Sequence, residues 1–511
     1  MDQQNLAGER SGRPAIVEEK VDSLYWLGAL VLTLAVRLYL FFSYYTINND
    51  GVLYIEAARH FWEGRWMEGL SSFYPPLFPL MIAAAYPLVH DWELAGQIWP
   101  FILGVLTLFP LFGLFRRVYG SRVARVALFF YAVSPYLARL SLEVRTEIPY
   151  VFFAVLAIYF LQRGLDSGSF LSFFLTGIGS ALAYLIRPEG IGLIMVGVLF
   201  LLYRGRIVRR LEKSGLKAAV LALGFVMFSA PYVLYLRWDT GHWMISRKTG
   251  LILSMALARH AADSERVTMK DSDQVSIVRF IVSRPLTYFK KVFIDSFRSL
   301  GFYFEALHYS YLPFLLIGWF FFFRERFWEK GDFLLMGFVF FYLAVFALLY
   351  VTRRYGIPLA AVSLGWVGAG YLAVEEYFCG RWRRRGYLLT GLVLILFAIG
   401  TLPKTLQAIG WDKFYLREAG VYLKEKDGNP TILTTNGRVA FYAAGQNRVL
   451  VKNPEDLPAF LAAREGDYLA LDRELYKQVE ASLEQKGWLL DKEFSGGAKE
   501  SLFILRRAKV P

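Results

Sequence analysis

Residues 24–46 of the chain read LYWLGALVLTLAVRLYLFFSYYT. This run is almost entirely apolar, and it is longer than the ~20 residues that an α-helix needs to cross a bilayer. The mixed-charge segment before it, residues 1–20, lacks the short basic region of a signal peptide, so we expect the run to be retained. The run therefore predicts a membrane-spanning helix near the start of the chain.

Similar apolar runs recur along most of the sequence. Hydrophobic residues make up 56% of the chain and charged residues 20%, which is more apolar than an ordinary soluble domain. The runs predict an α-helical polytopic membrane protein with about eleven transmembrane helices. After the first span, the predicted spans lie near 94–115, 123–141, 147–162, 169–186, 190–203, 216–236, 309–323, 332–351, 357–378 and 386–402.

Clusters of Arg and Lys predict the orientation. The clusters share one side of the membrane if residues 77–89 form a surface or re-entrant helix instead of a span, and basic loops face the cytoplasm. The N-terminus is then cytoplasmic. The same clustering accounts for the net charge of +14 without a nucleic-acid partner, and membrane lipids with anionic headgroups are compatible with it. The basic clusters are RRVYGSRVAR, QRG, RGRIVRRLEK, RERFWEK and RWRRR.

The chain is predicted to divide after residue 403. Residues 1–403 are predicted to form the transmembrane domain, with interfacial helices in the outer loop 47–93. Residues 404–511 form a small extracytoplasmic α/β domain. In this domain PTILTTNG, DYLALD and SLFILRR are typical of strands, and ELYKQVEASLEQKG is typical of an amphipathic helix with a Gly stop.

Ionisable residues gather at the predicted outer ends of the spans. A central Asp, Lys or Arg costs about 2.5–3.5 kcal/mol on insertion scales, so charges at one depth indicate function. Carboxylates and arginines together could hold a phosphate beside a base. The set comprises Asp50, Glu56, Arg139, Glu143, Arg145, Glu147, Arg187, Glu189, Arg353 and Arg354.

Asp50, in the stretch INNDGVLY, is the strongest candidate for a general base. Gly51 beside it allows close approach of another backbone. The alternative is a helix N-cap, because Asn48, Asn49 and Asp50 are all good caps. Glu147 likewise either faces the site or complements the N-terminus of the helix that it begins.

Cationic candidates lie on the same side. Arg187 and Glu189 belong to RPEG, which forms a tight reversal or reaches into a shared cavity. Arg353 and Arg354 break the positive-inside pattern, and an anionic phosphate is the simplest reason for them. Lys248, in SRKTG, adds a cationic donor or belongs to a solvated loop.

Several other chemistries lack their signatures. Cys379 is the single cysteine, so no intramolecular disulfide forms, and the five histidines show no pair at metal-binding spacing. No phosphate-binding loop is present, and GIGSAL lacks the dinucleotide fingerprint. An activated substrate is therefore expected from the lipid phase.

Together, these pieces resemble the GT-C superfamily of membrane glycosyltransferases. The nearest likeness is to bacterial relatives of the dolichyl-phosphate-mannose–protein mannosyltransferases and of the lipid A aminoarabinose transferase. The resemblance covers about residues 24–402, and the WWDYG signature of oligosaccharyltransferases is absent. The matching pieces are NNDGVLYIEAARHFWEG, YPPLFPLMIAAAYPLV, RLSLEVRTEIPYVFF, LIRPEGIGL and RRYGIPLA.

The resemblance implies transfer of a hexose or pentose from a polyprenyl-phosphate carrier, such as undecaprenyl phosphate. The acceptor is a lipid, glycan or protein at the outer face of the bacterial inner (cytoplasmic) membrane. The family's catalytic aspartate matches Asp50, and its second acidic position matches Glu147. Its arginine before tyrosine matches Arg354-Tyr355, which implies a contact to the carrier phosphate, and Tyr74 of YPP would shape the cavity.

The hypothesis is an inverting displacement in which Asp50 deprotonates the acceptor as polyprenyl phosphate leaves. No metal is required, although a carboxylate pair could hold a divalent ion. The rivals are a transporter or lipid flippase, which the lack of two similar halves disfavours, and a noncatalytic assembly protein. The donor-phosphate set is Arg354, Arg353, Tyr355, Lys248 and Arg187, and the cavity set is Glu56, Tyr74, Glu143 and Glu189.

Overall fold

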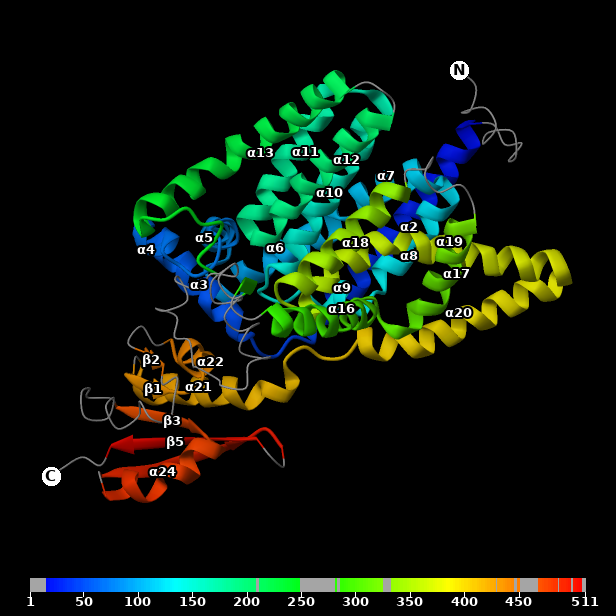
Figure 1. Ribbon diagram of the computed structural model, residues 1–511. Helices are drawn as coiled ribbons and strands as arrows, with labels where there is room; N and C mark the ends of the chain where they lie inside the picture. The colour runs from blue at the N-terminus through cyan, green and yellow to red at the C-terminus, as the bar shows by residue number, and fades with distance from the viewer. Residues whose placement is uncertain are drawn as a thin grey trace.

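The protein is a helical bundle with a small mixed sheet at one end (Figure 1). The N-terminal end of the chain and the C-terminal sheet lie at opposite corners of the molecule. The computed structural model describes residues 15–207, 211–248, 281–282, 285–324, 332–428, 430–444, 448–450, 467–485, 487–497 and 500–507.

The bundle contains long helices joined by short turns, as the apolar runs predict. Its helices are α2 (Ala15–Phe42), α3 (Asn49–Trp62), α4 (Trp66–Leu70), α5 (Leu77–Val89), α6 (Trp92–Leu106), α7 (Leu108–Tyr119), α8 (Ser121–Ala132), α9 (Pro135–Arg139), α10 (Glu147–Ser167), α11 (Phe170–Ile186), η1 (Pro188–Gly190), α12 (Ile191–Ile207), α13 (Leu211–Thr240), α16 (Pro285–Leu307), η3 (Tyr309–Tyr311), α17 (Leu312–Arg324), α18 (Asp332–Leu348), η5 (Arg353–Tyr355), α19 (Gly356–Trp382) and α20 (Arg384–Thr405).

Within the described residues, 7 helical stretches are long and apolar enough to cross a membrane. Three further predicted spans fall on the shorter apolar helices α11, α17 and α18. The predicted span 123–141 is different, because it is broken into α8 and α9. Pro135 explains the break, since the residue before a proline is driven out of the helical conformation.

The interval 237–308 holds no predicted span and is expected from the sequence to be a long outer loop, but its part Pro285–Leu307 forms helix α16. Its buried face carries residues at helical spacing, among them Tyr288, Lys291, Asp295 and Tyr303, while Phe289 and Phe293 are exposed. These charges lower the mean hydropathy of the segment and hide the helix from a search for apolar runs. Residues 249–280 of that loop lie outside the described part of the chain.

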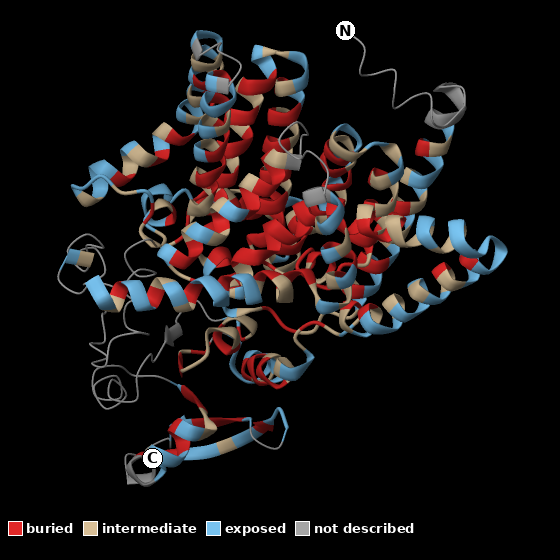
Figure 2. Cartoon of the chain, turned by 45° about the vertical axis from the view of Figure 1, so that its right-hand side comes forward, coloured by how far each residue is buried: buried red, intermediate tan, exposed pale blue. Residues whose placement is uncertain are grey.

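Helix α19 forms the centre of the bundle. It is buried over most of its length and packs against α17, α20, α8, α16 and α10, whereas α20 is largely exposed (Figure 2). Helix α10, which is also mostly buried, contacts α19, α11, α7 and α6. The N-terminal ends of α10 and α19 bring Glu147 and η5 to the same end of the bundle.

Two ion pairs lie at the end of the bundle where the basic cluster RRVYGSRVAR is found. At this end Asp22 pairs with Arg125 at 3.1 Å, and Arg117 pairs with Asp166 at 3.1 Å. These arginines come from the basic loops, while the candidate site residues lie at the other end. The cluster RERFWEK falls mostly outside the described residues.

The C-terminal segment forms a sheet of order β2-β1-β3-β5-β4. Strands β1, β2 and β3 are parallel, and β5 pairs antiparallel with both β3 and β4. The three predicted strands and the helix are confirmed, whereas β2 and the edge strand β4 carry too little apolar alternation to be predicted. The elements are η6 (Trp411–Lys413), α21 (Phe414–Asp427), β1 (Ile432–Thr434), α22 (Gly437–Tyr442), β2 (Arg448–Leu450), β3 (Tyr468–Asp472), α24 (Arg473–Gln485), β4 (Trp488–Ser495) and β5 (Ser501–Arg507).

Candidate active site

Asp50 lies in the first turn of α3 but does not cap the helix. The cap is Asn48, whose Oδ1 accepts a hydrogen bond from the Gly51 amide at 2.8 Å. The Asp50 carboxylate is therefore available to side chains from other elements. A Cβ added at Gly51 would lie 3.0 Å from the Val144 carbonyl oxygen, which confirms the predicted close approach.

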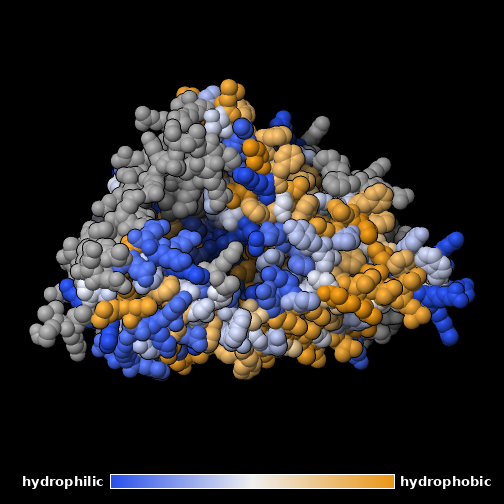
Figure 3. Space-filling model, turned by 90° about the horizontal axis from the view of Figure 1, so that it is seen from below, coloured by the Kyte–Doolittle hydropathy of each residue, from blue (hydrophilic) through white to orange (hydrophobic). Residues whose placement is uncertain are grey.

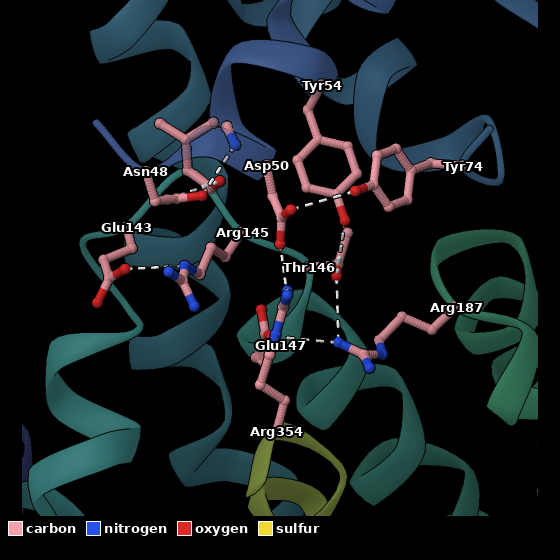
Figure 4. Close-up of polar contacts among 12 residues, drawn as sticks. Asn48, Asp50, Tyr54, Tyr74, Glu143, Arg145, Thr146, Glu147, Arg187 and Arg354 are labelled. Carbon is pink, nitrogen blue, oxygen red and sulfur yellow. Dashed lines mark hydrogen bonds and ion pairs between the residues drawn. The ribbon is translucent and has the colours of Figure 1, made fainter. Parts of the chain in front are cut away.

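Arg354 joins two carboxylates that are distant in the sequence (Figure 4). Its Nη1 binds Oδ2 of Asp50, and its Nε binds Oε1 of Glu147. The side chains of Arg354 and Asp50 are 31% and 26% exposed, whereas that of Glu147 is 1% exposed. One guanidinium thus links a solvent-accessible carboxylate to a fully buried one.

Glu147 has a second arginine partner. Nη1 of Arg187 lies 3.2 Å from Glu147 Oε1, and Nη2 of Arg187 lies 3.3 Å from Glu189 Oε1. Burial of an ionised carboxylate is costly unless it is paired, so the two guanidinium groups account for the depth at which Glu147 lies. We call Asp50, Glu147, Arg187, Glu189 and Arg354 the Arg354 network.

Two tyrosines adjoin the Arg354 network. The Tyr74 hydroxyl donates to Asp50 Oδ1 at 3.2 Å, and the Tyr74 ring packs on Tyr54 with centroids 4.4 Å apart. The Tyr54 hydroxyl lies 3.3 Å from Thr146 Oγ1, which also accepts from Arg187 at 3.4 Å. Burial raises the pKa of both phenols, which therefore stay protonated.

Tyr54 and Thr146 were not predicted from the sequence. Tyr54 follows Asp50 by one helical turn, and this spacing places their side chains on the same face of α3. Thr146 directly precedes Glu147. Their positions next to Asp50 and Glu147 in the helix or in the sequence are the signal that could have identified Tyr54 and Thr146.

Lys248 and Tyr355 complete the polar surroundings. The Lys248 ammonium lies 5.4 Å from the centroid of the Tyr74 ring. Burial lowers the pKa of Lys248, and the nearby Glu189 carboxylate opposes that shift. The Arg187 guanidinium lies 5.4 Å from the centroid of the Tyr355 ring. The other predicted residues of SRKTG, Thr249 and Gly250, lie outside the described residues.

A narrow cavity of about 10 Å³, enough for roughly one water molecule, lies beside the Arg354 network. Its polar wall contains Glu147, Arg187, Glu189 and Arg354, and its apolar wall includes Phe338 and other residues of α18 and α19. Seen from below, this end of the molecule is hollowed near its centre, and hydrophilic surface surrounds the hollow (Figure 3). The wall of this cavity combines the guanidinium groups of Arg187 and Arg354 with apolar side chains of α18 and α19.

The remaining predicted residues have other partners. Arg353 pairs with Glu305 of α16 at 2.7 Å, so it points away from its neighbour's carboxylates. Glu143 pairs with Arg145 at 2.9 Å, and Glu56 lies half-buried on α3. Arg139 donates to the carbonyl groups of Gln407 and Ala408.

Among the residues that the structure describes, no group of three or more His, Cys, Asp and Glu side chains could hold a metal ion. Asp50 and Glu147 are joined through the guanidinium of Arg354. The site thus holds a guanidinium group, a side chain that can bind anions, beside a partly exposed carboxylate.

Residues 74–235 match the family model described as dolichyl-phosphate-mannose-protein mannosyltransferase. The similarity to this family covers that segment of the chain. The matched segment contains Tyr74, Glu147 and Arg187, while Asp50 and Arg354 lie outside it.

Solved structures of other membrane proteins share the fold of this chain. ArnT from Cupriavidus metallidurans bound to undecaprenyl phosphate superposes with a TM-score of 0.61 at 11% identity, covering 95% of this chain and 98% of that one. The archaeal oligosaccharyltransferase AglB from Archaeoglobus fulgidus, in complex with an inhibitory peptide and a dolichol-phosphate, gives 0.53 at 13% identity over 96% and 75%. Among curated protein sequences, none matches the chain.

Proposed function

We propose that the chain transfers a sugar from a polyprenyl-phosphate carrier to an acceptor at the extracytoplasmic face of the bacterial cytoplasmic membrane. The observation that carries this proposal is the Arg354 guanidinium shared between Asp50 and the buried Glu147. This contact supports the proposal, because a guanidinium group is a good phosphate ligand and the carboxylate beside it is accessible. The undecaprenyl phosphate of the ArnT structure and the dolichol-phosphate of the AglB structure favour the same donor class.

Asp50 is the proposed general base. Its carboxylate is partly exposed and is oriented by the Tyr74 hydroxyl at 3.2 Å. The acceptor group loses its proton to Asp50 and forms a bond to the anomeric carbon. The bond from that carbon to the phosphate oxygen breaks on the opposite side, so the configuration inverts.

Arg354 is the proposed ligand of the departing phosphate. A phosphate already carries negative charge well, so a cation instead of an acid can assist its departure. The carboxylates of Asp50, Glu147 and Glu189 outnumber the guanidinium groups of Arg354 and Arg187 by one, and Lys248 balances the difference. A donor phosphate therefore has to take the place of a carboxylate, and Asp50 is the most accessible of the partners of Arg354.

We assign Glu147 a positioning role. Its carboxylate is buried between Arg354 and Arg187, where it contacts both guanidinium groups. Anchored through Nε, Arg354 keeps Nη1 directed toward the accessible side of the site, where Asp50 lies. Glu147 thus acts on the donor through Arg354.

The orientation rests on the basic loops. They gather at the end of the bundle that is opposite to the Arg354 network, and basic loops face the cytoplasm. The site and the C-terminal domain are then extracytoplasmic.

The test uses the purified full-length protein in lipid nanodiscs with undecaprenyl-phosphate-linked hexoses and pentoses. Release of undecaprenyl phosphate is measured by mass spectrometry. Asp50→Asn is expected to lower turnover by roughly 10²–10⁴-fold. Asp91→Asn is the matched control, because Asp91 caps α6 by accepting from the Leu94 amide at 2.7 Å, and Asn is an equally good cap.

Full turnover in the folded Asp50→Asn protein would remove Asp50 as the base. Movement of the labelled polyprenyl-phosphate carrier from one leaflet to the other in proteoliposomes, without sugar transfer, would support the flippase alternative instead.

A further inference from the structure

The segment that leads to Asp50 is bound by the C-terminal part of the chain. We call residues 43–49, between α2 and α3, the entry segment. The Ser43 carbonyl accepts from the Ile409 amide at 2.9 Å, and the Tyr45 amide donates to the Ile409 carbonyl at 2.9 Å. Gly410 has a φ of 72°, and a Cβ there would lie 2.6 Å from the Thr46 carbonyl oxygen. The linker after α20 therefore lies directly against the entry segment.

Side chains of α21 and α22 form hydrogen bonds with Tyr45, Ile47 and Asn49 of the entry segment. Arg417 donates to the Tyr45 carbonyl at 2.9 Å. The Tyr442 hydroxyl accepts from the Ile47 amide at 2.7 Å. Arg438 Nε donates to Asn49 Oδ1 at 2.8 Å. The final bond is made to the residue directly before Asp50.

Tyr442 has a defined hydrogen-bond direction. Its hydroxyl donates to Glu93 Oε1 at 2.7 Å, so its lone pairs face the Ile47 amide. Burial, followed by the nearby Glu93 carboxylate, raises the pKa of Tyr442, and the phenol remains protonated. Tyr442 thus links the C-terminal domain to Glu93, at the start of α6, and to the entry segment.

The contact is also packed. The Arg59 guanidinium of α3 lies 5.5 Å from the Trp92 ring and 5.9 Å from the Phe441 ring. Tyr45 packs edge-on against Trp411 with ring centroids 4.6 Å apart. The C-terminal domain therefore packs directly against α3 and the entry segment.

We infer that the C-terminal domain positions Asp50 by fixing the entry segment, and that Tyr442 is the positioning residue at its centre. The inference rests on the proposed role of Asp50 as base. The donor-phosphate ligands Arg354 and Lys248 come from other segments of the chain. Loss of the Tyr442 hydroxyl should therefore displace the base without weakening donor binding.

The experiment compares Tyr442→Phe with Tyr422→Phe in the full-length protein. Tyr422 is a matched control, because its hydroxyl donates to Asp491 at 2.8 Å inside the same domain. Tyr442→Phe is expected to lower kcat roughly 10- to 100-fold, since small displacements of a reacting group are costly, and the donor KM should not rise. Tyr422→Phe is expected to keep both constants.

Hydrogen exchange of the donor-free protein supplies a readout that needs no activity. In Tyr442→Phe the amides of residues 45–52 should exchange about five- to tenfold faster, because Ile47 loses its acceptor. Exchange in β3 and β5 should stay the same, which verifies that the domain is folded. Tyr422→Phe should leave the entry segment unchanged.

Unchanged exchange of the entry segment in Tyr442→Phe would overturn the inference, and so would faster exchange with an unchanged kcat. An equal fall in affinity for the donor would also overturn it, since that points to general disruption. Failure of the proposed function shows up separately, as full transfer by Asp50→Asn.

Discussion

Arg354 and Asp50 form an ion pair across 304 positions of the sequence. Without a donor the proposed base and the proposed phosphate ligand neutralise each other. A bound phosphate would compete with Asp50 for Nη1 of Arg354, and this competition would free the carboxylate for the acceptor. The predictions below concern the groups that hold or adjoin this pair.

Replacement of Arg354 by Lys should lower kcat by about 10²-fold and raise the donor KM. A lysine keeps the charge but lacks the planar fork that binds Asp50 and Glu147 together. Steady-state kinetics with a polyprenyl-phosphate sugar measure both constants. Arg353→Lys is the neighbouring control and should change little, because Arg353 pairs with Glu305. Equal losses in the two variants would contradict the assignment.

Glu147→Gln should destabilise the protein by about 3–5 kcal/mol, because Arg187 and Arg354 lose the buried carboxylate that they share and keep one counterion each. Thermal unfolding in nanodiscs measures the loss. Glu143→Gln removes a carboxylate from a more accessible pair with Arg145 and should cost about 1 kcal/mol or less. An unchanged Tm for Glu147→Gln would argue against its role as the buried anchor of Arg354.

Tyr74→Phe should reduce kcat by roughly tenfold, because the Asp50 carboxylate loses the hydroxyl that orients it. The phenyl ring retains the packing on Tyr54. Tyr54→Phe is the paired comparison, since its hydroxyl contacts Thr146. We expect Tyr54→Phe to lower kcat less than Tyr74→Phe does, and turnover assays on both variants measure this difference. The reverse ranking would show that Tyr74 does not orient the base.

The donor KM should rise at alkaline pH through Lys248. Burial lowers the pKa of Lys248 below its ordinary value of 10.5, so the ammonium loses its charge earlier than an exposed lysine as the pH increases. Phosphate affinity contributed by Lys248 is then present below the lowered pKa and lost above it. Lys248→Arg should remove this alkaline limb, because guanidinium stays charged. An identical pH profile for both proteins would exclude Lys248 from the phosphate site.

Much of the site could be predicted because its signals are local. Asp50, Glu147, Arg187 and Arg354 each follow or precede an apolar run, and charge beside the membrane is costly enough to be conspicuous in the sequence. Which side chains pair with one another could not be predicted from the sequence. Arg353 and Arg354 are adjacent and chemically identical, yet the turn of η5 directs one to Glu305 and the other to Asp50 and Glu147.

The sequence by itself determined that the chain builds membrane helices, which loops are basic, and which ionisable residues lie at the ends of spans. Those properties follow from hydrophobicity and charge, which act residue by residue. Only the tertiary structure decided that Arg354 joins Asp50 to Glu147 and that Tyr442 binds the Ile47 amide. Hydrogen bonds and ion pairs depend on distances of a few ångströms between residues far apart in the chain, and such distances exist only after the helices have packed.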